Sequence, residues 1–247
     1  MLHGFGSSAG FFQEQLRFLK SERKIVVFDA EGHGKSEKNP QEKPDAHLIN
    51  DSIVDIQELL YILQLDEPLV LIGHSLVGGG IAQEFALNYP HLVKCLILLN
   101  SGAFLIDNTI RNIFWNLLPQ MVRMEFNKLI LDNIEILLDK IIPFIRGALV
   151  GDQDYNDFVY ERLDGIVETE IFDMIQHPIN PSKIQCPTLI IGAELDNYAP
   201  LWMSKDLANK IPNSQYYVIP MCGHFGPNHR PEEYNKLISQ FLKQLGI

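Results

Sequence analysis

The sequence has few basic residues and no long hydrophobic run. Its 20 lysine and arginine residues are outnumbered by 31 aspartate and glutamate residues, which gives a formal net charge of -11. Nucleic acid and anionic membrane surfaces both repel a chain of this charge, so neither is an expected partner. No apolar run approaches the roughly 18 residues of a membrane span, and no basic segment followed by an apolar one opens the chain.

Cysteine is also scarce. Cys95, Cys186 and Cys222 are odd in number, far apart and each next to apolar residues. This pattern indicates reduced core side chains rather than a disulfide framework or a metal site, and predicts a cytoplasmic protein. Five histidines show no metal-ligand spacing: His33, His47, His91, His177 and His229. No G-x-G-x-x-G turn and no phosphate loop with lysine is present, so we expect neither a metal nor a nucleotide cofactor.

Short apolar runs rich in β-branched residues alternate with segments of helical period. The expected strands are 24–29, 69–72, 93–99, 188–191 and 216–219. The expected helices are 11–19, 49–63, 80–87 and 234–245. Continuous apolar strands alternating with amphipathic helices predict an α/β fold, in which a mostly parallel sheet carries helices on both faces.

The alternation stops between about residues 103 and 183, where nearly all of the sequence has helical period. Strands resume directly afterwards, so a second independent helical domain is the weaker reading. We expect residues 103–183 to form a helical cap over the carboxyl edge of the sheet. Residues 1–102 and 184–247 then form the two parts of one core.

The most informative segment is the apolar run from Leu69 that ends on Gly73-His74-Ser75 and leads into a helical pattern. A strand, a sharp turn and a helix in direct succession hold a serine hydroxyl away from the backbone, where a base can reach it. Ser75 is therefore the candidate nucleophile.

A serine hydroxyl needs a base to take its proton, and the base works best when a carboxylate fixes its tautomer. His224 follows the last expected strand in the segment Cys222-Gly-His-Phe225. Asp196 and Glu194 both follow the strand before it and compete for the role of acid. We favour Asp196, because it lies in the loop proper, ahead of a proline that fixes the turn.

Negative charge that develops on a substrate oxygen needs preorganised amide donors. The Leu76 N–H, directly after the candidate nucleophile, is the first candidate. The glycine-rich turn His3-Gly-Phe-Gly6 lets the backbone direct its amides into the pocket. From this turn we select the Phe5 N–H as the second donor.

Five segments, in order along nearly the whole chain, resemble the small esterase- and lipase-like members of the α/β-hydrolase superfamily. They are His3 to Gly6, Asp29 to Ser36, Gly73 to Ser75, Gly192 to Pro200 and Gly223 to Phe225. The chain order of the three candidate residues, serine, aspartate and histidine, is also the order in that superfamily.

The resemblance implies Ser75 as nucleophile, His224 as base and Asp196 as the acid that orients it. It also implies Phe5 and Leu76 as oxyanion donors and the segment from Ala103 to about Lys183 as the cap. The segment from Asp29 to Ser36 resembles a structural turn of the superfamily and receives no catalytic role.

One departure concerns Val77, which stands where the superfamily has glycine two residues after the serine. That glycine lets the helix and the strand pack closely at a strained turn, so we expect a β-branched residue there to push them apart and to reduce activity.

These features predict a cofactor-independent serine hydrolase that acts on a small molecule, a carboxylic ester of a small or medium-sized apolar acid. Cleavage of a carbon-carbon bond beside a ketone, or of a thioester, uses the same residues. A low-turnover ligand-binding relative is the alternative from another class. A dehalogenase is disfavoured, because those relatives carry aspartate at the position of Ser75.

The second departure is that the superfamily's first strands precede the His-Gly turn, whereas here the turn begins at His3. In the superfamily's sheet the third strand lies between the fourth and fifth, so its loss leaves a central gap. We expect a truncated start and poor stability for the chain as given. Expression with and without the codons immediately upstream tests this, and equal solubility and melting temperature would contradict it.

Overall fold

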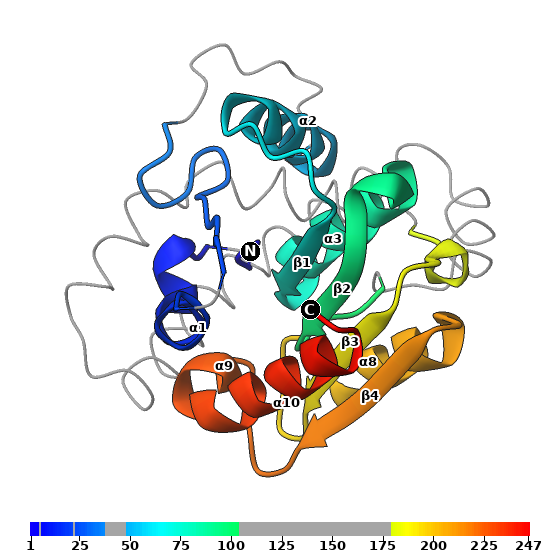
Figure 1. Ribbon diagram of the computed structural model, residues 1–247. Coiled ribbons are helices and arrows are strands. Elements are labelled where there is room, and N and C mark those ends of the chain that lie inside the picture. Colours follow the sequence, from blue (N-terminus) through cyan, green and yellow to red (C-terminus); the bar gives the residue numbers. More distant parts are fainter. Residues whose placement is uncertain (5, 22, 38–47, 104–178) are drawn as a thin grey trace, which may run out of the picture. The chain divides into compact units, whose positions relative to one another are not determined.

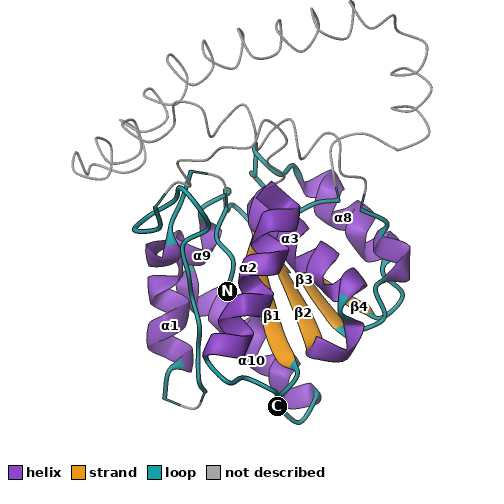
Figure 2. Cartoon of the chain, turned by 90° about the horizontal axis from the view of Figure 1, so that it is seen from above, coloured by secondary structure: helices purple, strands orange, loops and turns teal. Residues whose placement is uncertain are grey.

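The computed structural model describes residues 1–4, 6–21, 23–37, 48–103 and 179–247. Within these residues, four parallel strands form one sheet in the order β1 (Leu69–His74), β2 (Val93–Leu99), β3 (Thr188–Ala193) and β4 (Ser214–Ile219). Figure 2 shows the strands side by side in this order. The predicted α/β class with a parallel sheet is confirmed.

Helices separate the strands along the chain. They are α1 (Gln13–Leu19), α2 (Leu48–Ile62), α3 (Ser75–Asn88), α8 (Leu201–Lys210), α9 (Gly226–His229) and α10 (Pro231–Gln244). Short 3-10 turns are η1 (Ala9–Phe12), η2 (Pro90–Leu92) and η3 (Pro181–Lys183). In Figure 1, α3 and α8 lie behind the sheet and α10 lies in front of it.

Side chains pack on both faces of the sheet at its central strands, and β2 shows how. Successive side chains of a strand point to opposite faces. Leu96 and Leu98 belong to a core cluster that includes residues of α2, α3 and α8. Ile97 and Leu99 belong to the second cluster, which includes residues of α1 and α10. A strand covered on both faces has no polar side, which explains the continuous apolar sequence of β2 from Cys95 to Leu99.

The expected strand at 24–29 is wrong, because the structure has no strand there. Leu2 takes the edge position beside β1, where its N–H donates to the Ile72 oxygen (2.8 Å) and its oxygen accepts from the His74 N–H (3.0 Å). This single bridge, between Leu2 and Gly73, does not continue. Residues 24–29 therefore have no neighbouring strand with which to form a ladder.

His3 ties the start of the chain to the segment that follows residue 29. Its Nδ1–H donates to the Gly4 oxygen (2.8 Å), and its Nε2 accepts from the Ala30 N–H (3.0 Å). The Gly4 carbonyl can only accept, so these two partners fix the neutral tautomer with the proton on Nδ1. The side chain is buried, and burial lowers the pKa of His3 from 6.5 to about 4.

We expect acid to destabilise the fold through His3. Between pH 6.5 and about 4 the unfolded chain binds a proton that the folded chain does not. The free energy of unfolding therefore falls as the pH falls through this window, by at most about 1.4 kcal/mol per pH unit for this group. The contribution is fully present above pH 6.5.

In His3→Gln, the amide oxygen can replace Nε2 as acceptor without titrating. Chemical denaturation at several pH values should therefore show that the free energy of unfolding depends less steeply on pH in this variant. The difference in slope should correspond to at most one proton. His91→Gln, at an exposed position, serves as the control and should keep the wild-type slope. Identical slopes for His3→Gln and wild type would contradict the prediction.

Candidate active site

Ser75 lies at the point where β1 ends and α3 begins, as the sequence predicts for the candidate nucleophile. Its φ is +65°, in the left-handed region that a residue with a Cβ occupies only at a cost of about 1–2 kcal/mol. The strain lets the chain reverse between strand and helix within one residue, so the side chain leaves the backbone at the carboxyl edge of the sheet.

Glycines let strand and helix meet closely at this turn. A Cβ on Gly73 would lie 2.8 Å from the Gly78 carbonyl carbon and from Gly79 Cα, too close for any side chain. Val77 does not separate the two elements, contrary to the expectation from its branched side chain. It lies on the helix face that joins the core and is buried there.

The structure brings the three predicted site residues together. His224 Nε2 lies 2.9 Å from Ser75 Oγ, and His224 Nδ1 lies 2.8 Å from Asp196 Oδ2. All three side chains are buried. An ionised carboxylate only accepts, so Nδ1 carries the imidazole proton and Nε2 is left to accept from the serine hydroxyl. This is the arrangement that a base needs in order to activate a hydroxyl.

Asp196 is fixed by its own loop. Its Oδ1 accepts from the Tyr198 N–H (2.9 Å) and the Ala199 N–H (2.8 Å), which leaves Oδ2 directed at the imidazole. The alternative acid, Glu194, instead accepts from the Met221 N–H (2.8 Å) at the surface. Of the two carboxylates that the sequence offers, the structure brings only Asp196 to His224.

Backbone passes close to the nucleophile on two sides. A Cβ on Gly4 would lie 2.6 Å from Ser75 Cβ, so only glycine fits there. Leu76 is in the first turn of α3, where the first four N–H groups have no acceptor within the helix and carry the positive end of the helix dipole. Phe5, the second predicted donor, lies outside the described residues, and so does nearly all of the expected cap.

Sequence reasoning missed two side chains beside the triad. His74 precedes the nucleophile, and its ring centroid lies 4.7 Å from that of His224. Asn100 follows β2 directly, and its Nδ2 lies 2.7 Å from the His224 oxygen. A polar residue at or shortly after the end of a buried strand is part of the signal that pointed to Ser75 and Asp196, and it could have pointed to Asn100 too.

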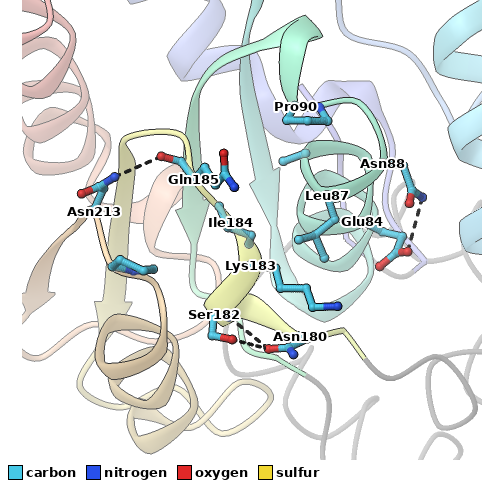
Figure 3. A pocket seen from close by; sticks show the side chains of 12 residues that line it. Glu84, Leu87, Asn88, Pro90, Asn180, Ser182, Lys183, Ile184, Gln185 and Asn213 are labelled. Carbon is cyan, nitrogen blue, oxygen red and sulfur yellow. Dashed lines mark hydrogen bonds between the residues drawn. The ribbon is translucent and has the colours of Figure 1, made fainter.

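A groove of about 800 Å³ lies at the opposite end of the strands (Figure 3). Its lining includes Pro90, Gln185 and Asn213, each of which precedes a strand of the sheet. The triad residues instead follow strands, and the two ends of a parallel sheet face apart. The groove is therefore separate from the candidate active site.

The described part of the chain has neither a candidate metal site nor a candidate membrane span. No group of three or more histidine, cysteine, aspartate or glutamate side chains there could hold a metal ion. No helix among these same residues is both long and apolar enough to cross a membrane.

A parallel sheet with a serine, a histidine and an aspartate gathered at the carboxyl ends of its strands defines the α/β-hydrolase class. The model of the family described as "alpha/beta hydrolase fold" matches residues 1–227. The chain belongs to this family.

Relatives are similar over nearly the whole chain. It is 27% identical to an uncharacterised hydrolase, YugF, of Bacillus subtilis (strain 168), over 98% of this chain and 88% of the relative. It is also 25% identical to a 2-hydroxy-6-oxononadienedioate/2-hydroxy-6-oxononatrienedioate hydrolase of Comamonas testosteroni. That similarity covers 98% of this chain and 86% of the relative. A thermophilic esterase from Thermogutta terrifontis has the same fold, with a TM-score of 0.72 and 22% identity, over 98% of this chain and 88% of the esterase.

The left-handed conformation of Ser75 predicts a difference between two substitutions. Ser75→Ala keeps a Cβ and its strain, whereas Ser75→Gly removes both. We expect Ser75→Gly to be the more stable variant by about 1 kcal/mol, even though glycine gains more freedom on unfolding. Chemical denaturation of both variants measures this. Equal stabilities, or a more stable Ser75→Ala, would show that the turn is not strained in solution.

Proposed function

We propose that the protein is a cofactor-independent serine hydrolase that cleaves a carboxylic ester of a small or medium-sized apolar acid. The observation that carries the proposal is the continuous hydrogen-bond chain from Ser75 Oγ through the His224 ring to Asp196 Oδ2. The relatives' names, which are those of hydrolases, support the reaction class.

In the proposed reaction, Ser75 Oγ attacks the ester carbonyl carbon while its proton passes to His224 Nε2. The carbonyl electron pair moves to the oxygen, which the Leu76 and Phe5 N–H groups stabilise. Collapse of this intermediate expels the alcohol, which takes the proton from His224. A water molecule then attacks the acyl-serine and gives its proton to His224, and the acid leaves as Ser75 regains the proton. Asp196 stabilises the imidazolium in both halves.

Exposed apolar side chains in the two loops that carry Asp196 and His224 support an apolar acyl group. They are Leu195 and Tyr198, in the Asp196 loop, and Met221, in the His224 loop. The Tyr198 ring centroid lies 5.1 Å from that of His224. We further propose that residues 103–183 form a cap over this edge and set the substrate range.

A second candidate is hydrolysis of a carbon-carbon bond beside a ketone, on the same three residues. The similarity to the Comamonas testosteroni hydrolase favours it. The two reactions differ in what is released: the ester gives an alcohol, whereas the diketone-type substrate gives a second carbon fragment with a new C–H bond. Product identification separates them.

A fluorophosphonate probe tests the proposed nucleophile. We expect the wild-type protein to be labelled covalently and Ser75→Ala to lose both the labelling and at least about 10⁴-fold in kcat, because the nucleophile and its base act as a unit.

A series of nitrophenyl esters graded by acyl chain length should show the highest kcat/KM for short to medium chains.

Ser204→Ala is a matched control. Ser204 is a second buried serine, on α8, whose hydroxyl donates to the Leu201 oxygen (3.0 Å) and not to an imidazole. This variant should be labelled like the wild type. A folded wild-type protein that resists labelling would overturn the proposal and favour the low-turnover ligand-binding alternative.

A further inference from the structure

The main-chain oxygen of His224 accepts two hydrogen bonds from side chains at the carboxyl ends of two strands. Asn100 Nδ2, at the end of β2, donates to it over 2.7 Å, and His74 Nε2, at the end of β1, lies 3.0 Å from it. Both side chains are buried. We call this pair of donors the His224 clamp.

A third side chain orients Asn100. The Tyr234 hydroxyl, from α10, donates to Asn100 Oδ1 over 2.8 Å, and Tyr234 is fully buried. An amide whose oxygen is held by a donor must present its NH₂ group on the other side. That group also reaches the Gly223 oxygen at 3.3 Å. Asn100 has a φ of +48°, in the region where asparagine, aspartate and glycine are best tolerated.

His74 is held as a donor by its surroundings. A carbonyl oxygen can only accept, so Nε2 must carry the proton that it shares with the His224 oxygen. Burial lowers the pKa of His74 well below 6.5, which keeps the ring neutral with this single N–H. The ring stacks on Phe11, with 4.0 Å between the centroids. Nδ1 has no partner among the described residues.

We propose that His74, Asn100 and Tyr234 are positioning residues that hold the His224 backbone so that its imidazole reaches Ser75. This rests on the proposed function, in which His224 is the base. The His224 loop follows β4, which is not a neighbour of β1 in the sheet. The clamp binds this loop to the two strands beside the nucleophile, and both imidazole nitrogens stay available for Ser75 and Asp196.

Matched substitutions test the clamp. Asn100→Gly removes the donor and tolerates the left-handed backbone. His74→Met removes the donor, whereas His74→Gln has a side chain of the same length and keeps an N–H. We expect Asn100→Gly and His74→Met each to lower kcat about tenfold or more and to change KM less than about twofold. The reason is that a catalytic group displaced by about 1 Å can lose about 100-fold in rate. His74→Gln should recover most of the lost kcat, and Tyr234→Phe should show a smaller loss than Asn100→Gly.

Thr188→Val controls for stability. Its hydroxyl is buried at the far end of β3 and donates to the Cys186 oxygen over 3.0 Å. This variant should lose a comparable hydrogen bond and some stability while keeping the wild-type kcat. If the clamp variants lose kcat only in proportion to their loss of stability, or keep the wild-type kcat while folded, the proposal is overturned.

A second readout needs no substrate. The proton on His224 Nδ1, shared with Asp196, should give a downfield NMR resonance that Asp196→Ala should abolish and thereby assign. Asn100→Gly and His74→Met should shift or broaden it, and Thr188→Val should not. If the wild type resists the fluorophosphonate probe but this resonance responds, the proposed function fails while the clamp stands. If the resonance is unchanged in both clamp variants, the clamp fails whatever the chemistry.

Discussion

The parallel pairing of the strands is the constraint on which the site depends. Four strands that run in one direction place all their carboxyl ends at one edge. Residues that are 149 positions apart in the sequence, Ser75 and His224, then follow strands of the same sheet and come within hydrogen-bond distance. No single segment specifies the site. The parallel strands specify it together, because each strand ends at the same edge and the loops that follow carry the polar residues there.

Backbone strain and close packing at the end of β1 also position the nucleophile. Ser75 adopts a left-handed backbone, and Gly73 meets Gly78 with no room for a Cβ. Val77 shows that the close approach does not depend on the position two residues after the serine. In this chain the contact falls one residue later, so a valine at that position is accommodated as an ordinary core residue.

Much of the fold was predictable, and the exceptions have identifiable causes. Strands β1 to β4 were expected because short apolar runs that contain β-branched residues are typical of buried strands. The strand expected at 24–29 does not form, because a strand needs a neighbour and Leu2 supplies one bridge only. Helix α8 was overlooked, since only a few of its residues face the core, among them Met203 and Leu207.

The candidate site, like the fold, was predictable only in part. Serine, histidine and aspartate could be found because each follows an apolar strand in a glycine- or proline-marked loop. The contacts of His74, Asn100 and Tyr234 could not be found, because they depend on distances between residues far apart in the sequence. Local sequence patterns carry no information about such distances.

The contact of His74 and Asn100 with a main-chain atom has a chemical consequence. An imidazole has two nitrogens, and in the arrangement described here Ser75 and Asp196 use both. A donor or acceptor that held the ring itself would compete with one of them and change the tautomer. A clamp on the carbonyl oxygen fixes the backbone from which the ring projects without drawing on either nitrogen. Its members are neutral, since burial keeps His74 uncharged and Asn100 carries no charge, so they hold the loop without adding a charge that would oppose a developing imidazolium.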